Sequence, residues 1–176
     1  SRGLGDVYKR QVLIRGGPGD DRITGGSGEN ELYGEDGDDR ITGGASADQI
    51  TGGNGGDTLS GMAGTDTYYF ANGWGLDTFR DMEGDTIVDF SAVTDDLEVS
   101  ITNISTSVLS DKGDELRMSR AKVTQIILGT GTDTIYISEP PEGTIEIVDT
   151  GGPSTTHFTF ARNTSDKPDG IVFLLS

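Results

Sequence analysis

The 176-residue sequence predicts an all-β protein whose repeating part is a parallel β-roll, a flat solenoid of short strands. Six nine-residue units follow one another without a gap from residue 16; glycine fills most of their first, second and fourth places, and a large apolar residue stands at the eighth. A unit this short forms one turn and one strand, and it buries its apolar side chain only by stacking on its neighbours. The units read GGPGDDRIT, GGSGENELY, GEDGDDRIT, GGASADQIT, GGNGGDTLS and GMAGTDTYY.

Each unit carries a side-chain oxygen at its sixth place. The eighth place holds Ile23, Leu32, Ile41, Ile50, Leu59 and Tyr68. Nine residues cross the roll once, so units eighteen residues apart stack on one edge: Asp21, Asp39 and Asp57 form a first column, and Asn30, Asp48 and Asp66 a second. Carboxylates at strand spacing, about 4.8 Å, repel one another unless a cation lies between them. Oxygen ligands without His or Cys favour a hard cation, and a flexible site of many oxygens favours Ca²⁺ over Mg²⁺.

This pattern resembles the RTX (repeats-in-toxin, haemolysin-type calcium-binding repeat) family, whose consensus GGxGxDxUx, with U a large apolar residue, forms a calcium-loaded parallel β-roll. The resemblance covers residues 16–69 closely and extends more loosely to about residue 90. It implies one ion between turns that lie two units apart. The earlier turn contributes the carbonyls of places two and four and its Asp, and the later turn contributes the carbonyls of places one and three and its Asp.

Carried onto this chain, the resemblance implies about four Ca²⁺ ions. The expected ligands are Gly17, Gly19 and Asp21 with Gly34, Asp36 and Asp39 for the first; Gly26, Gly28 and Asn30 with Gly43, Ala45 and Asp48 for the second; Glu35, Gly37 and Asp39 with Gly52, Asn54 and Asp57 for the third; and Gly44, Ser46 and Asp48 with Gly61, Ala63 and Asp66 for the fourth.

The sequence departs from the family pattern at Asn30, Glu35, Ser46, Gly56 and Met62. Asn30 offers an oxygen without a charge, so we expect the second ion to be the weakest. Glu35, Ser46 and Met62 replace glycine, which puts the geometry of their turns in question more than their carbonyl ligands. Gly56 stands at a place that the family leaves variable and costs only some rigidity.

Charge predicts that the roll folds only with calcium. The chain has 30 acidic and 13 basic residues, a formal net charge of −17, so nucleic acid and anionic membrane surfaces are poor partners. Residues 16–69 contain eleven acidic side chains against Arg22 and Arg40, an excess of nine negative charges. One large apolar residue per unit buries too little to offset this repulsion and the backbone entropy. Without calcium we expect a disordered Gly/Asp-rich segment; the alternative, a metal-free solenoid held by side-chain ladders, would fold in chelator.

The first eleven residues, SRGLGDVYKRQ, have no repeat character. They resemble the translated adapter or vector tail found at the ends of reading frames in metagenomic contigs, and we treat residues 1–11 as a non-native lead-in; a natural polar lead-in is the alternative. On the first interpretation the chain is a fragment of a longer protein. Cysteine is absent, and no apolar run approaches the roughly 20 residues that span a membrane. The RTX resemblance implies a secreted bacterial protein, extracellular or on the cell surface, that passes through a type I secretion apparatus.

After the six-repeat roll (12–70), we expect terminating rungs at 71–93. Residues 72–80, NGWGLDTFR, read as a unit with Asp77 at the oxygen place and Phe79 at the apolar place. Tyr69, Phe70, Trp74 and Phe79 resemble the aromatic cap that covers the open end of a roll; for Trp74, a ligand-stacking role is the less favoured alternative. Asp77, Asp81 and Asp85 either hold one further ion or are solvated loop residues.

Residues 94–176 read as a β-rich extension, because apolar residues alternate with polar ones at Leu97, Val99 and Ile101, at Ile145 and Ile147, and at Phe158 and Phe160. One isolated unit, 128–136, places Asp133 at the oxygen position. It lacks a partner unit eighteen residues away, so we expect a rung without a good calcium site. The apolar end GIVFLL, 170–175, is an edge strand or a weak type I secretion signal.

The sequence contains no recognisable catalytic motif. His157 is the only histidine, and zinc-protease, nucleophile-elbow, phosphate-loop, dinucleotide-binding and EF-hand patterns are missing. We expect His157 to be a strand surface residue, and the NIS and NTS sequons at Asn103 and Asn163 matter only in a glycosylating source. We therefore predict a non-enzymatic, calcium-binding module of a secreted bacterial protein. The alternative is the non-catalytic tail of a secreted RTX protease or lipase whose catalytic domain lies upstream.

Overall fold

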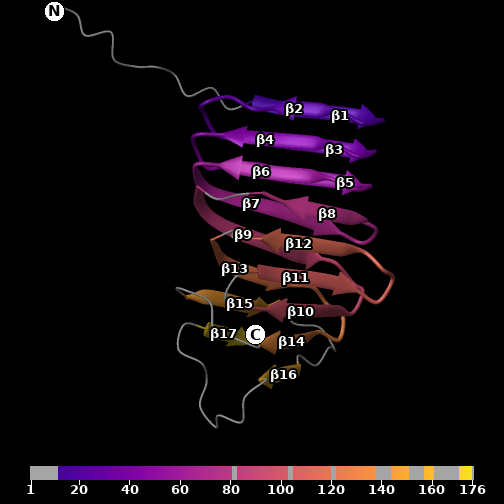
Figure 1. The fold of residues 1–176 in the computed structure, drawn as a ribbon, viewed down its shortest axis with the longest axis vertical. Helices are drawn as coiled ribbons and strands as arrows, with labels where there is room; N and C mark the ends of the chain where they lie inside the picture. Colours follow the sequence, from indigo (N-terminus) through magenta and orange to yellow (C-terminus); the bar gives the residue numbers. More distant parts are fainter. Residues whose placement is uncertain are drawn as a thin grey trace, which may run out of the picture.

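Two β-sheets face each other along the stack of strands (Figure 1). The computed structural model describes residues 12–80, 83–102, 105–119, 122–137, 144–150, 157–160 and 171–175, and these contain seventeen strands and no helix. The strands pile up as rungs, with β1 and β2 at one end of the stack and β16 at the other. The predicted all-β parallel solenoid is confirmed.

The first sheet has eight strands, all paired in parallel. In sheet order they are β1 (Val12–Pro18), β3 (Asn30–Asp36), β5 (Gln49–Asn54), β7 (Gly64–Ala71), β9 (Gly84–Ala92), β13 (Val123–Leu128), β15 (Ile145–Asp149) and β17 (Ile171–Leu175).

The second sheet has nine strands. Starting beside β1, its order is β2 (Arg22–Thr24), β4 (Arg40–Gly44), β6 (Thr58–Met62), β8 (Leu76–Phe79), β12 (Glu115–Ser119), β11 (Ser105–Ser110), β10 (Leu97–Ile101), β14 (Thr134–Ile137) and β16 (His157–Phe160). The β10–β11 and β11–β12 pairs are antiparallel, and the other pairs in this sheet are parallel.

Strand register confirms that two nine-residue units make one rung. Leu32 lies beside Ile50 in the first sheet and Ile41 beside Leu59 in the second, in each case eighteen residues apart. The chain therefore crosses from one sheet to the other with every unit. The eighth-place side chains meet between the sheets, and the exposed fraction of Ile23 is 4% while the other five are fully buried. Their burial supplies the apolar core of the repeating part.

Two extra residues, Phe70 and Ala71, lengthen the next rung without ending the stack. Pairing across them joins residues twenty apart, as Leu59 with Phe79 and Tyr68 with Val88. Phe70, Trp74 and Phe90 are buried and pack together, with the Phe70 and Phe90 rings stacked 4.8 Å apart.

The aromatic residues differ from the expected end cap. They lie inside the stack because β9 and later strands continue both sheets beyond them. Tyr69 points outward and is 38% exposed.

The C-terminal half extends the same two sheets. The antiparallel strands β10, β11 and β12 insert between β8 and β14, while β13 continues the first sheet from β9. The predicted alternation is confirmed, since Leu97, Val99, Ile101, Ile145 and Ile147 are buried. β17 forms the last strand of the first sheet, as expected for GIVFLL. The lead-in 1–11, Asp81, both sequon asparagines and the side chains of β16 lie outside the described residues.

Candidate metal centre

The first column of carboxylates runs along one edge of the roll and is held by the backbone. Asp39 Oδ1 accepts a 2.7 Å hydrogen bond from the peptide N–H of Asp21, and Asp57 Oδ1 accepts one of 2.8 Å from that of Asp39. Asp77 Oδ1 repeats this contact with the N–H of Asp57 at 2.8 Å, so the column has four members. One oxygen of Asp39, Asp57 and Asp77 is thereby fixed toward the preceding rung.

The second column, on the opposite edge, uses the same contact. Asp48 Oδ1 accepts from the N–H of Asn30 and Asp66 Oδ1 from the N–H of Asp48, both at 2.8 Å. All three side chains are buried. Thr86 follows Asp66 in register, and it is also buried. The second column therefore passes from carboxylates to a hydroxyl after Asp66.

In three of these carboxylates the second oxygen is buried without compensation. Among the described residues, Oδ2 of Asp39, Asp48 and Asp57 has no hydrogen-bond partner. A buried charge without a partner is costly, so the group either binds a cation or takes up a proton. Burial, aided by the charge of Asp39, raises the pKa of Asp57 to about 6, and burial with the charges of Asp57 and Asp114 raises the pKa of Asp77 to about 8. The columns are thus acceptor-rich and deficient in positive charge.

Glycine at the first place of each unit makes room for these oxygens. A Cβ at Gly34, Gly43 or Gly52 would overlap Oδ2 of the Asp five residues later in its own unit. None of these first-place glycines has a positive φ. Close approach of the carboxylate, and not a positive φ, therefore accounts for glycine at the first place.

Turns on the first edge share one backbone conformation. Their second and fourth places take positive φ, at Gly17, Gly19, Glu35, Gly37, Gly53, Gly55, Gly73 and Gly75. Glu35 holds a φ of 83° although it has a side chain, and its carboxylate bonds Arg15 Nη1 at 3.1 Å. The Glu35 substitution thus leaves the turn geometry in place.

Turns on the second edge are less regular. Only Met62 (φ 76°) and Gly64 (φ 138°) take positive φ there, whereas Gly26, Gly28, Gly44 and Ser46 do not. Ser46 Oγ instead donates a 2.9 Å hydrogen bond to the carbonyl of Ser27 in the preceding rung. The second-edge turns thus depart from positive φ at glycines as well as at Ser46, while Met62 takes a positive φ although it replaces glycine.

Asn30 fits poorly as a cation ligand. Its Nδ2 donates to the carbonyl of Gly28 at 2.8 Å, to that of Gly26 at 3.4 Å and to Asp48 Oδ1 at 2.8 Å. These three oxygens belong to the set expected for the second ion. The amide group supplies the hydrogens that the acceptors need, and its partial positive charge faces the place where that ion would bind. In this orientation of the amide, the second set offers a cation less than the sets with two carboxylates do, in line with the expectation that the second ion is the weakest.

The structure brings together the paired turns expected for the other three ions. Gly19 N–H donates to the carbonyl of Asp36 at 2.6 Å, and Gly37 N–H to that of Asn54 at 2.9 Å. On the second edge, Ala63 N–H donates to the carbonyl of Gly44 at 3.1 Å. In the described ranges no group of three acidic, His or Cys side chains converges. An ion between rungs would accordingly rely on two carboxylates and on backbone carbonyls.

Of the expected trio, the structure places Asp77 and Asp85 in different sheets, and Asp81 lies outside the described residues. Asp77 belongs to the first column, in β8 of the second sheet, while Asp85 lies in β9 of the first sheet and pairs with Lys122 Nζ. Sequence reasoning missed Asp114, whose two carboxylate oxygens accept 3.1 Å hydrogen bonds from the N–H groups of Gly73 and Gly75. Asp114 comes from a hairpin that no repeat marks, so no local signal pointed to it.

Comparison with known proteins supports the repeat assignment. A family model described as RTX calcium-binding nonapeptide repeat (4 copies) matches residues 15–50, 33–68 and 42–78. No curated protein and no solved structure matches the chain. Within the described residues, none of the secondary structure is a helix of the length and hydrophobicity needed to cross a bilayer.

Proposed function

Residues 15–78 are an array of RTX calcium-binding repeats, which form a structural, calcium-binding module, and on this premise we propose that Ca²⁺ between successive rungs completes the fold of a secreted protein outside the cell. The observation that carries the proposal is the uncompensated, buried Oδ2 of Asp39, Asp48 and Asp57. Ca²⁺ would supply the positive charge and the oxygen-seeking coordination that these atoms lack.

The residues proposed to hold the ions follow the two columns. On the first edge they are the Asp21–Asp39 and Asp39–Asp57 pairs with the carbonyls of their turns, and the geometry extends to the Asp57–Asp77 pair. On the second edge the Asp48–Asp66 pair is proposed with its turn carbonyls. Each pair is already aligned by an N–H to Oδ1 bond, so little rearrangement is required for the carboxylates to meet a cation.

Calcium dependence follows from charge and burial together. In the metal-free roll, ionised carboxylates would be stacked one rung apart, at a spacing of about 4.8 Å, with little solvent between them. A ligand that binds the folded state and not the unfolded chain stabilises the fold in proportion to the logarithm of its concentration. Extracellular calcium modules bind with dissociation constants of roughly 10⁻⁴–10⁻³ M. A module in that range stays open at cytosolic calcium and closes outside, which suits passage through a type I secretion channel.

The test is a calcium titration of the 176-residue chain followed by far-UV circular dichroism, started in chelator and repeated with Mg²⁺. We expect a cooperative gain of β signal with Ca²⁺ and a much weaker response to Mg²⁺, which prefers a rigid octahedral site. A full β spectrum in chelator at neutral pH, unchanged by Ca²⁺, would overturn the proposal and favour a metal-free solenoid.

A further inference from the structure

A contact like those of the array recurs far outside it. β10 and β14 pair in parallel, and Asp133, just before β14, accepts a 3.0 Å hydrogen bond on Oδ1 from the peptide N–H of Leu97. This is the bond that joins Asp39 to Asp57 in the first column. The partners here are thirty-six residues apart, because the antiparallel strands β11 and β12 intervene in the chain. The isolated unit 128–136 therefore does have a stacking partner, the turn before β10, although this turn does not lie eighteen residues away in the sequence.

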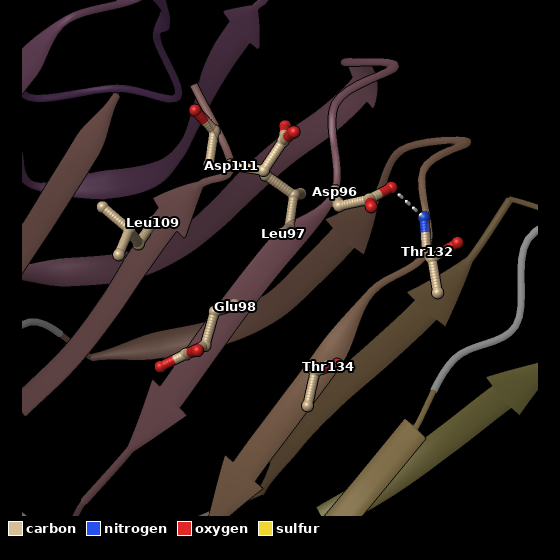
Figure 2. A pocket seen from close by; sticks show the side chains of 8 residues that line it. Asp96, Leu97, Glu98, Leu109, Asp111, Thr132 and Thr134 are labelled. Atoms are coloured by element: carbon tan, nitrogen blue, oxygen red, sulfur yellow. Dashed lines mark hydrogen bonds between the residues drawn. The ribbon is translucent and has the colours of Figure 1, made fainter. Parts of the chain in front are cut away.

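The turns before β10 and β14 are stacked as the array turns are. Figure 2 shows Asp96 reaching the N–H of Thr132, a 2.7 Å bond that repeats the contact of Asp38 Oδ1 with the N–H of Gly56. Thr130 N–H donates to the carbonyl of Val93 at 3.0 Å, as Ala63 N–H does to that of Gly44.

Two glycines in the turn before β14 leave space for backbone carbonyls of the turn before β10. A Cβ at Gly129 would overlap the carbonyl oxygen of Val93, and one at Gly131 would overlap that of Asp95. Gly53 and Gly55 stand in the same relation to the carbonyls of Glu35 and Gly37 in the array. The earlier turn, AVTDDL, has no repeat glycines, so only the three-dimensional structure reveals the match.

Asp133 has the same deficit as the array carboxylates. It is fully buried, and within the described residues its Oδ2 has no hydrogen-bond partner. Burial and the charges of Asp149 and Asp96 raise the pKa of Asp133 to about 6. Lys112, which also interacts with the charges of Asp95 and Asp96, is exposed and pairs with Asp111. The described basic groups therefore leave Asp133 uncompensated.

We propose that the turns 93–97 and 129–133 enclose a further site for a hard divalent cation, with Asp133 Oδ2 as its carboxylate ligand and the carbonyls of Val93 and Asp95 facing it. The site lies outside the residues that match the repeat model. Leu97 replaces the second carboxylate of an array pair, so this site binds more weakly than the array. The inference rests on the proposed function in taking Ca²⁺ as the cation.

The experiment counts bound Ca²⁺ per chain by native mass spectrometry and calorimetry, using Asp133→Asn and, as control, Asp111→Asn. Asp133→Asn removes the charge at nearly constant size, and Asp111 is an exposed residue paired with Lys112. We expect Asp133→Asn to lose one ion, the weakest, and to keep the tighter ones, while Asp111→Asn keeps all. An unchanged ion count and unchanged affinities in Asp133→Asn overturn the inference.

A second variant, Leu97→Asp, tests the site by a gain of affinity, and thermal unfolding in Ca²⁺ first checks that this change of a buried residue leaves the fold in place. It restores the missing carboxylate and should tighten the weakest binding step by about tenfold or more, because ligand charge sets affinity in such sites. No tightening overturns the inference. If the unmodified chain binds no Ca²⁺, the proposed function fails as a whole; if the array ions bind but neither variant changes the weakest step, only the further site fails.

Discussion

Asp39 stands between two members of its own column: its Oδ1 accepts the N–H of Asp21, and its own N–H donates to Oδ1 of Asp57 at 2.8 Å. Asp66 has a carboxylate neighbour on one side only, because Thr86 follows it in register. The two residues have the same chemistry and the same burial. They differ in the number of neighbouring carboxylates in the column, which is two for Asp39 and one for Asp66.

Asp39→Ala is expected to weaken calcium binding more than Asp66→Ala. A charge-assisted contact is worth about 1.5–3 kcal/mol, which corresponds to roughly a 10- to 100-fold loss of affinity for each ion affected. Asp39→Ala affects two ions and Asp66→Ala one. Calorimetric titration of both variants measures the difference. Equal losses would contradict the alternation of turns between two edges.

The repeating half of the fold was predictable because its signal is local and periodic. Ile41 and Leu59 recur at a fixed spacing, and a strand that short has one way to bury such residues. The position of β10–β12 was not predictable in the same way. Pairing of Leu116 beside Asp77 joins segments thirty-nine residues apart, and nothing in the intervening sequence specifies that separation.

In the candidate site, too, the features set by the repeat period were predictable and the others were not. The alignment of Asp21, Asp39 and Asp57 follows from the period, whereas the orientation of the Asn30 amide depends on which acceptors surround it in the folded turn. The sequence shows that Asn30 has an amide oxygen and an amide nitrogen, but it does not show which of the two faces the turn. The pairing of Asp133 with Leu97 could not be predicted for a related reason, since Leu97 carries no repeat motif.

Asn30→Asp is expected to add one bound Ca²⁺. The change removes the Nδ2 donor from the oxygens of Gly26, Gly28 and Asp48 and supplies a second carboxylate. In chelator the same variant should be less stable, because three hydrogen bonds are lost and a buried charge is gained. Native mass spectrometry in Ca²⁺ and thermal unfolding in chelator measure the two effects.

Gln49→Glu is the matched control for that variant, since it adds the same charge at an exposed position on β5. It should leave the ion count unchanged. An Asn30→Asp variant with the ion count of the unmodified chain would mean that the amide does not exclude a cation from the second set.

Gly52→Ala is expected to destabilise the calcium-bound roll by about 1–3 kcal/mol, the usual cost of overpacking. Its Cβ would overlap Oδ2 of Asp57 and displace a proposed ligand. Gly56→Ala, in the same turn, meets nothing closer than Oδ1 of Asp38 at 3.3 Å, an exposed side chain that can move, and should be nearly neutral. Thermal unfolding in Ca²⁺ compares the two. Similar losses in the two variants would show that space for the carboxylate does not explain first-place glycine.

Protonation of the buried carboxylates at acidic pH should partly replace calcium in stabilising the fold. In the metal-free fold, burial raises the pKa of Asp57 to about 6 and that of Asp77 to about 8, above the value of 3.8 for an unperturbed Asp. A folded state that holds its protons more tightly than the unfolded chain loses stability as pH rises through the folded pKa values. In chelator, the melting temperature should therefore fall between about pH 5 and pH 8. Saturating Ca²⁺ should reverse the trend, because protons then compete with the ion for the same oxygens.

Asp77→Asn separates this effect from the general repulsion of a chain with a net charge of −17. The variant removes the group with the highest raised pKa, so the fall in melting temperature above about pH 6 should largely disappear, while the fall below about pH 6, to which Asp57 also contributes, should persist with a shallower slope. Thermal unfolding in chelator at closely spaced pH values measures both limbs. If both proteins lose stability in parallel across the whole range, the dependence arises from surface charge, and the buried columns do not control it.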